Sequence, residues 1–248
     1  MLSFQAKLIW AHQQLDALRD DLMTFGRSKP CVVVYDFDRK TLYHTWRVRG
    51  QVNTPPASIS LRLGDTLFNF RGVLDHLAWQ LVSVSGGKPG RRTALPICNT
   101  RAIFDSKPVQ AQMAGMLARV QAAIERLQPY NGRDPHGTDR FLLLLDSLGN
   151  VEKHRHFNLI VASLEAARLI TPNPERVTEF FIHKGPIEDG TILARCKGNV
   201  DMNFDAVFGV AFGERGNAAG ESVDKVILNI ELAVEAVLQE LACFLPRG

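Results

Sequence analysis

The stretch that decides the fold covers residues 63–84 and reads LGDTLFNFRGVLDHLAWQLVSV. Large apolar residues recur in it at alternating steps of four and three, and two glycines follow at 86–87. They are Leu63, Leu67, Phe70, Leu74, Leu77, Leu81 and Val84. An average spacing of 3.5 residues is typical of helices that pack nearly parallel or antiparallel in a bundle. The sequence therefore predicts a long, deeply buried helix at about residues 61–85.

The same spacing occurs near both ends of the chain, and it predicts terminal helices at residues 3–25 and 222–244. In the first helix the apolar positions run from Phe4 to Phe25, with Gly26 as the expected stop. In the second they run from Val223 to Phe244. Because the two helices share their length and their spacing, we expect them to pack along each other.

The remaining segments predict two further helices and several strands. Apolar and Ala-rich stretches indicate helices at 109–128 and 138–169, which with the core helix make a helical bundle across 60–169. Alternating apolar residues flank turn-forming residues in a hairpin at 31–52 and in a β segment at 177–213. We therefore expect an α+β fold in a single domain, 1–248. Its parts are a bundle of about five helices and an antiparallel sheet of about five strands.

Composition narrows the function only slightly. The chain has 248 residues, 46% of them hydrophobic, with 29 basic against 26 acidic residues and a net charge of +3. Such a balance is typical of a folded globular protein and excludes a mainly disordered one. No apolar run approaches the roughly 20 residues that span a bilayer, and the first residues lack a basic and then apolar leader. The prediction is a cytoplasmic protein without a membrane partner.

Four cysteines are spread through the sequence, at positions 31, 98, 196 and 243, without any C-x-x-C pair. Disulfide frameworks and zinc knuckles use closely spaced cysteines. We therefore expect buried, reduced thiols.

The core helix also carries a second apolar strip, formed by Leu61, Phe68 and Trp79. At 100° per residue this strip lies opposite the first one. Arg71 and Asp75 fall on one border of the strip, and Asn69 and His76 fall on the other. A helix that is apolar on two sides is buried between neighbours. We expect the strip to be covered within the chain or across a dimer.

A second group of polar residues follows Asp146. Asp146, Asn150 and His154 recur at steps of four and share one helix face. The same segment contains Glu152, Lys153, Arg155 and His156. The group has three interpretations: an anion or RNA site opposite Arg71 and His76, a metal site built on Asp146, His154 and His156, or a solvated polar face. Since Arg155 would repel a cation, we predict no metal and no cofactor.

Several stretches of this sequence resemble a widespread family of uncharacterised bacterial proteins. They are the pattern from Gly64 to Trp79, Leu95-Pro96-Ile97, Leu127 to Asn131, and Asn150-x-Glu152-Lys153-His154-Arg155. The resemblance covers most of the chain and implies no activity.

The spacing Arg71-x4-His76 on a bundle helix more distantly resembles the Arg-x4-6-His element of HEPN-domain ribonucleases. That resemblance implies metal-independent cleavage of RNA by a homodimer, with a partner protein such as an antitoxin. His76 would be the general acid and base, and Arg71 would stabilise charge on the phosphoryl group. Supporting or anion-binding roles would fall to the polar neighbours Asn69, Asp75, Asn150, Lys153, His154 and Arg155.

A non-catalytic interaction or ligand-binding module is the alternative. In that case Arg71 bridges Asp75 at i,i+4, and His76 is hydrogen-bonded at an interface. The geometry that separates the two hypotheses is simple. Arg71 and His76 opening onto one cleft favours the enzyme, and a buried His76 held by a backbone group favours the binding module.

Overall fold

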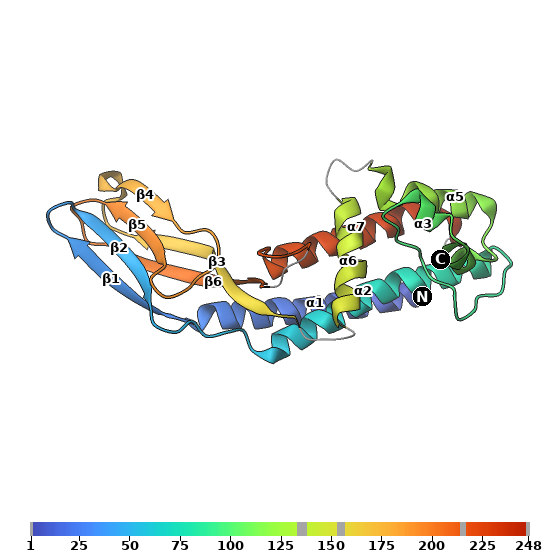
Figure 1. Ribbon diagram of the computed structural model, residues 1–248, viewed down its shortest axis with the longest axis horizontal. Helices are drawn as coiled ribbons and strands as arrows, with labels where there is room; N and C mark the ends of the chain where they lie inside the picture. The colour runs from blue at the N-terminus through green and yellow to red at the C-terminus, as the bar shows by residue number, and fades with distance from the viewer. Residues whose placement is uncertain (1, 133–137, 153–156, 214–216, 247–248) are drawn as a thin grey trace. The chain divides into compact units, whose positions relative to one another are not determined.

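The computed structural model describes residues 2–132, 138–152, 157–213 and 217–246. Within these ranges the chain forms seven α-helices and six β-strands (Figure 1). The helices are α1 (Ser3–Arg27), α2 (Ala57–Val84), α3 (Arg101–Phe104), α4 (Lys107–Gln110), α5 (Ala118–Arg126), α6 (Thr138–Glu152) and α7 (Val223–Leu241). The strands are β1 (Val32–Asp38), β2 (Tyr43–Arg49), β3 (Leu159–Ile170), β4 (Thr178–Ile182), β5 (Ile192–Lys197) and β6 (Asn203–Phe212). The predicted α+β class is confirmed.

The chain divides into two compact units, each assembled from segments that are distant in sequence. Met1–Ala17, Leu61–His156 and Lys225–Gly248 form the first, which we call the helical unit. Leu18–Ser60 and Phe157–Asp224 form the second, the sheet unit, which contains all six described strands. The organisation of 1–248 as a single domain stays a prediction.

The core of the helical unit is built on α2, as the 3.5-residue spacing predicted. Six of its stripe residues have no exposed surface: Leu63, Leu67, Phe70, Leu74, Leu77 and Leu81. Leu15 of α1 and Val234 of α7 are also buried in this unit. The buried stripes of all three helices thus contribute to one core.

Polar contacts show how the helices of this unit lie. The Lys7 Nζ donates to the Asn69 Oδ1 at 2.6 Å, which joins α1 to α2. Gly72 allows this approach, because a Cβ there would lie 2.8 Å from the Lys7 Cε. On another face of α1, the His12 Nε2 lies 3.3 Å from the Glu231 Oε1 of α7. The predicted pairing of the terminal helices is therefore confirmed within this unit.

The sheet unit contains two antiparallel sheets, a four-stranded one in the order β1-β2-β5-β4 and a two-stranded one, β3-β6. The predicted hairpin at 31–52 is present as β1 and β2. Between its strands, His44 is buried, with Nδ1 2.7 Å from the Tyr35 hydroxyl and Nε2 2.8 Å from the Gly198 carbonyl oxygen. The expectation of one sheet of about five strands is wrong, because six strands form two sheets.

Two of the predicted helices are wrong in part. The helix predicted at 138–169 ends at Glu152, and Leu159–Ile170 is instead strand β3. This segment pairs with β6 along its whole length, so pairing with a strongly alternating partner overrides the helix propensity of its Leu, Glu and Ala residues. The helix predicted at 109–128 is broken at Gly115, whose φ of 88° no helix accommodates. The bundle therefore has more and shorter helices than predicted.

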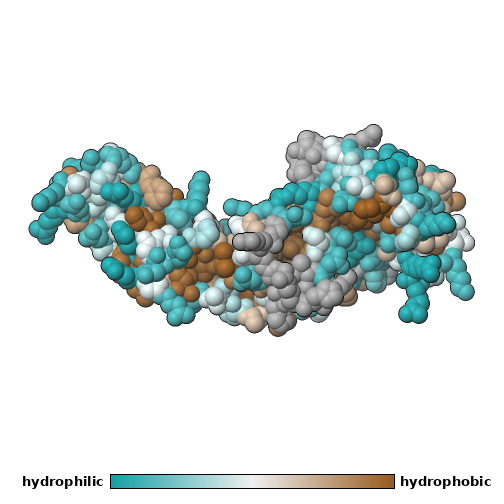
Figure 2. All heavy atoms as spheres, viewed as in Figure 1, coloured by the Kyte–Doolittle hydropathy of each residue, from teal (hydrophilic) through white to brown (hydrophobic). Residues whose placement is uncertain are grey.

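The second apolar strip of α2 is exposed, contrary to the expectation of burial within the chain. Leu61 is 49% exposed, Phe68 62% and Trp79 49%. Figure 2 shows hydrophobic side chains reaching the viewed surface over both helices and strands. None of the helices in the described ranges combines the length and the hydropathy of a membrane-spanning segment.

Candidate functional site

Arg71 is anchored by hydrogen bonds to the segment that follows α2. Its Nη2 donates to the Leu95 carbonyl oxygen at 2.7 Å and to the Asp75 Oδ1 at 3.0 Å. The same carboxylate oxygen of Asp75 accepts the Leu95 backbone N–H at 3.2 Å. The i,i+4 bridge that the binding-module hypothesis predicted is therefore present.

Gln128 holds the same segment from its other side. Its buried Nε2 donates to the Pro96 carbonyl oxygen at 3.0 Å, and its Oε1 accepts the Cys98 N–H at 2.9 Å. Three of the stretches that carry the family resemblance, on α2, at 95–97 and at 127–131, are thereby joined in one hydrogen-bonded network.

One pocket of the helical unit lies next to Arg71. Its volume is about 310 Å³. The lining residues come from α2 and α6: Phe68, Arg71, Asp75, Leu145, Asp146, Gly149 and Asn150. The two polar groups found in the sequence, around Arg71 and around Asp146, therefore meet at one pocket, which we call the Arg71 pocket.

The other terminal nitrogen of the Arg71 guanidinium, Nη1, is unusual because it is buried without a hydrogen bond to any of the described residues. It lies 4.0 Å from the Asp146 Oδ1, too far for a hydrogen bond. Asp146 itself is 48% exposed at its side chain. A donor and an acceptor thus stand next to each other at the pocket without bonding to each other.

The charges that line the pocket disfavour an anion. The lining has one guanidinium, that of Arg71, and two carboxylates, those of Asp75 and Asp146. The formal charges of the described lining residues therefore sum to −1. Phosphate sites need an excess of positive charge. Burial, and then the charge of Asp146, raise the pKa of the nearby Cys98 thiol, so little of it is present as the nucleophilic thiolate. The described part of the site is suited to binding rather than to phosphoryl chemistry.

The other predicted site residues lie elsewhere. His76 is exposed and is not among the lining residues, so the Arg71 pocket does not bring Arg71 and His76 together. Asn69 is buried, accepts from Lys7 and donates its Nδ2 to the Asp65 carbonyl oxygen at 2.7 Å. Asn150 lines the pocket. Lys153, His154, Arg155 and His156 lie outside the described residues.

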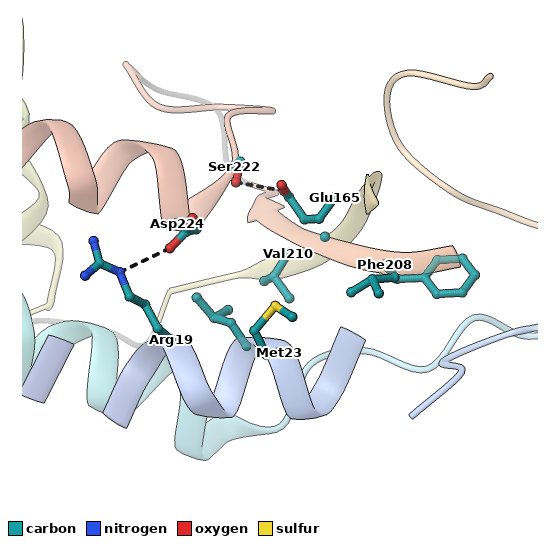
Figure 3. Close-up of a pocket in the computed structure, with 10 residues that line it drawn as sticks. Arg19, Met23, Glu165, Phe208, Val210, Ser222 and Asp224 are labelled. Atoms are coloured by element: carbon teal, nitrogen blue, oxygen red, sulfur yellow. Dashed lines mark hydrogen bonds and ion pairs between the residues drawn. The ribbon is translucent and has the colours of Figure 1, made fainter. Parts of the chain in front are cut away.

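Besides a more open pocket of about 490 Å³ beside Tyr35 and Trp46, the sheet unit contains one of about 280 Å³ (Figure 3). Leu22, Met23 and Val210 give it an apolar lining. Its polar side chains pair with each other: the Arg19 Nε lies 3.5 Å from the Asp224 Oδ1, and the Ser222 hydroxyl donates to the Glu165 Oε1 at 3.0 Å. Because these polar groups already satisfy one another, the pocket offers a ligand little besides apolar contact.

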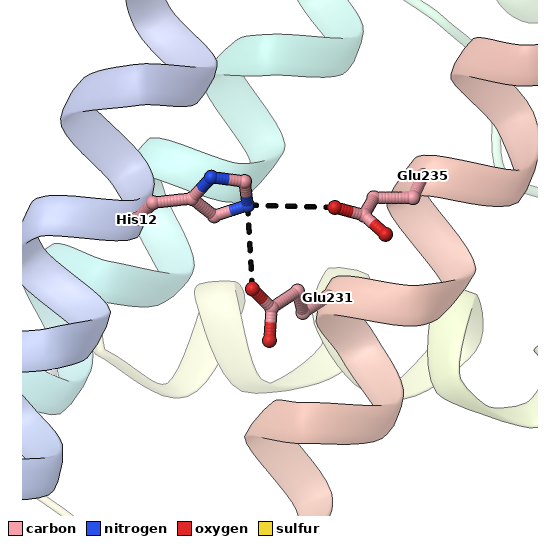
Figure 4. A group of neighbouring side chains, drawn as sticks. All are labelled: His12, Glu231 and Glu235. Carbon is pink, nitrogen blue, oxygen red and sulfur yellow. Dashed lines mark ion pairs between the residues drawn. The ribbon is translucent and has the colours of Figure 1, made fainter.

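A third feature was missed at the level of sequence. His12, Glu231 and Glu235 place one ligand atom each within 4.8 Å of one another in the helical unit (Figure 4). The signal was available, because Glu231 and Glu235 are four residues apart on a helix that was expected to pack against the helix carrying His12.

Comparison of the chain with protein-family models, with curated proteins and with solved structures gives no match. The resemblances stated for the sequence therefore stay expectations, and function has to be argued from the site.

Proposed function

We propose that this protein is a binding module whose Arg71 pocket takes a planar ring with adjacent hydrogen-bond acceptor and donor groups, specifically a guanine base exposed in single-stranded RNA. One observation carries the proposal. The buried Arg71 Nη1 has no acceptor among the described residues and lies 4.0 Å from the Asp146 Oδ1. A ligand that accepts from Arg71 and donates to Asp146 satisfies both groups at once.

Guanine has this pattern on its Watson–Crick edge. Its O6 is an acceptor, and its neighbouring N1–H and N2–H₂ are donors. Because a carboxylate only accepts hydrogen bonds and has two oxygens, Asp146 matches a pair of adjacent donors, and the guanidinium matches O6. Adenine, cytosine and uracil each offer a single donor group beside an acceptor, so they match the carboxylate less well.

The shape and the rim of the pocket support a base. A volume of about 310 Å³ is at the small end of ligand sites. Phe68 lines the pocket and is 62% exposed, so its ring is accessible for stacking. Proteins read single-stranded RNA by stacking unpaired bases on aromatic rings and bonding their Watson–Crick edges. The lining charge of −1 favours a neutral base over a phosphate.

Nucleotide titration tests the proposal. GMP, AMP, CMP and UMP are titrated by calorimetry, and a labelled oligouridine with and without one central guanosine is titrated by fluorescence anisotropy. We expect GMP and the guanosine oligonucleotide to bind most tightly. Equal affinity for all four nucleotides, or none for GMP, would overturn the proposal.

Two exposed aromatic residues of α2 provide a matched pair of variants. Phe68→Ala removes the ring at the pocket, and stacking of about 1–3 kcal/mol corresponds to a loss of about 5- to 150-fold in affinity. Trp79→Ala removes an equally exposed ring that does not line the pocket, and its affinity should equal that of the parent. Asp146→Asn should abolish the preference for guanine, since an amide oxygen with a neighbouring NH₂ no longer accepts two donors.

A second candidate function is metal-independent RNA cleavage by a homodimer, through Arg71 and His76. The exposed imidazole of His76 on the same helix favours it, as does the exposed strip of Leu61, Phe68 and Trp79, which a second copy of the chain would cover. Single-stranded RNA is incubated with the protein in EDTA, beside His76→Ala and the control His183→Ala. Cleavage that only His76→Ala abolishes supports the enzyme, and no cleavage by the parent protein rejects it.

A further inference from the structure

The three side chains His12, Glu231 and Glu235 converge between α1 and α7. The His12 Nε2 lies 3.3 Å from the Glu231 Oε1 and 3.6 Å from the Glu235 Oε1. The two glutamates are one helical turn apart, and both point toward the imidazole (Figure 4). One nitrogen and two carboxylate oxygens are thus presented to a common point inside the helical unit.

The orientation of the imidazole is not that of an ordinary hydrogen bond. The Nε2 atom is buried from solvent, yet it makes no hydrogen bond within the described residues, although two carboxylate oxygens are near it. The nitrogen is therefore close to both oxygens without forming a hydrogen bond to either one. An imidazole nitrogen that shares a metal ion with two carboxylates is oriented in this way.

The distances identify the coordination geometry. Zinc binds imidazole nitrogen at about 2.0–2.1 Å and carboxylate oxygen at about 2.0–2.2 Å, so two ligands of a tetrahedral ion lie about 3.3–3.5 Å apart. Two adjacent ligands of an octahedral ion with bonds of 2.0–2.1 Å lie only about 3 Å apart. The observed 3.3 and 3.6 Å are closer to the tetrahedral spacing than to the octahedral one.

We propose that His12, Glu231 and Glu235 bind a zinc ion, with the fourth position held by water. The donor set suits such an ion, because neutral imidazole and carboxylates are both common zinc ligands, and three protein ligands with one open position are typical of reactive zinc sites. The ion also neutralises two glutamates that repel each other across one helical turn. Since it joins α1 to α7, its binding stabilises the folded helical unit.

This zinc site is separate from the Arg71 pocket, and its test does not depend on RNA. The purified full chain is freed of metal with a chelator, and Zn²⁺ is titrated by calorimetry while the thermal midpoint is followed. We expect one bound ion per chain and a rise in the midpoint that a chelator reverses. Co²⁺ in place of Zn²⁺ should give the intense visible bands of a four-coordinate site.

Conservative variants make the test specific. Glu231→Gln and Glu235→Gln keep the size of each side chain and remove its charge, and each should weaken Zn²⁺ binding by at least about tenfold. Glu235 is 38% exposed, so its variant is expected to fold even where His12→Ala does not. The control is His183→Ala, which removes a partly exposed histidine of the sheet unit.

Three results would overturn the proposal. They are parent protein that binds no Zn²⁺, Gln variants that bind it as tightly as the parent, and weakening by His183→Ala alone. An octahedral Co²⁺ spectrum would contradict the tetrahedral assignment. Each of the three results named first would leave the cluster as a histidine–glutamate ion pair only.

Discussion

Arg71 and Leu95 are joined by a hydrogen bond of 2.7 Å from the guanidinium Nη2 to the backbone carbonyl oxygen, and this bond fixes the segment after α2 against the helix. The other terminal nitrogen of the same guanidinium, Nη1, is buried and has no hydrogen-bond partner among the described residues. The bond to Leu95 gives Arg71 a structural role, and the proposed function adds a binding role to it.

Replacing Arg71 by lysine should destabilise the protein more than the same replacement of an exposed arginine. The Nη2 of Arg71 donates to both Leu95 and Asp75. Because lysine carries its ammonium on a differently shaped side chain, it does not place a donor at the Nη2 position, so we expect Arg71→Lys to lower the free energy of unfolding by about 1–2 kcal/mol. Arg101→Lys is the control, because Arg101 also pairs at i,i+4, with Asp105, but both side chains are more than half exposed. Its loss should be much smaller than that of Arg71→Lys, because solvent screens an exposed ion pair. Urea unfolding measures both, and equal losses would contradict a structural role for Arg71.

The two faces of α2 should respond differently to truncation. Leu74 has no exposed surface, so Leu74→Ala leaves a cavity and should cost about 2–5 kcal/mol. Trp79 is 49% exposed, and Trp79→Ala should cost less than about 1 kcal/mol in the isolated chain. Urea unfolding is combined with light scattering, which reports the mass of each variant. A large loss for Trp79→Ala together with a change from dimer to monomer would show that a second chain covers the strip.

The helices that lie against one core could be predicted because their apolar spacing is local information. The 4-3 pattern specifies a buried face whatever its partner is, and that face is buried from Leu63 to Leu81, although its last residue, Val84, is exposed. Segment 159–170 could not be predicted in this way, because its state depends on β6, more than thirty residues later. The same limit applies to the second strip of α2: the sequence shows that it is apolar, but not whether a neighbour covers it.

The candidate site was predicted in part for a similar reason. The pairing of Arg71 with Asp75 follows from their i,i+4 spacing, and it is present. The contact with Leu95 and the convergence on Asp146 depend on how separate segments pack. The direction of His76, away from the Arg71 pocket, follows from the helical angle that separates it from Arg71, which spacing in the motif alone does not convey.

Two glycines inside helices should give opposite results when a methyl group is added. A Cβ at Gly26 would lie 2.3 Å from the carbonyl oxygen of Phe208, a backbone atom that cannot move aside. We expect Gly26→Ala to cost about 1–3 kcal/mol. This glycine lies inside α1 and does not end the helix as predicted; it allows the helix to pack closely against Phe208. A Cβ at Gly72 meets only the flexible end of Lys7. Gly72→Ala should be neutral or stabilise by up to about 1 kcal/mol, because alanine is the better helix former.

Thermal or urea unfolding of the two alanine variants measures the difference. Circular dichroism of each folded variant serves as the control for retained helix. Destabilisation by Gly72→Ala equal to that by Gly26→Ala would mean that the close approach of Lys7 to α2 is as rigid as a backbone contact.

The four cysteines should divide into three unreactive thiols and one reactive thiol. Cys31, Cys98 and Cys196 are buried and Cys243 is exposed, so the expectation of buried, reduced thiols holds for three of the four. Burial raises the pKa of each buried thiol above its ordinary value of 9.0. A raised pKa leaves less of the reactive thiolate at a given pH. A thiol reagent at pH 8 should therefore modify one cysteine quickly in the native protein and four in urea, and Cys243→Ser should abolish the fast phase.

The raised pKa values of the three buried thiols give the direction in which stability changes with pH. Near and above pH 9 the unfolded chain loses its thiol protons while the folded chain retains them at the three buried positions. The folded state then binds more protons than the unfolded state, so the stability contributed by these groups is present below pH 9 and falls as the pH rises through the raised values. Urea midpoints measured from pH 7 to 10.5 should decline above about pH 9, and Cys196→Ala, which removes one of these thiols, should make the decline shallower. A decline of the same steepness in that variant would assign the alkaline loss to other groups.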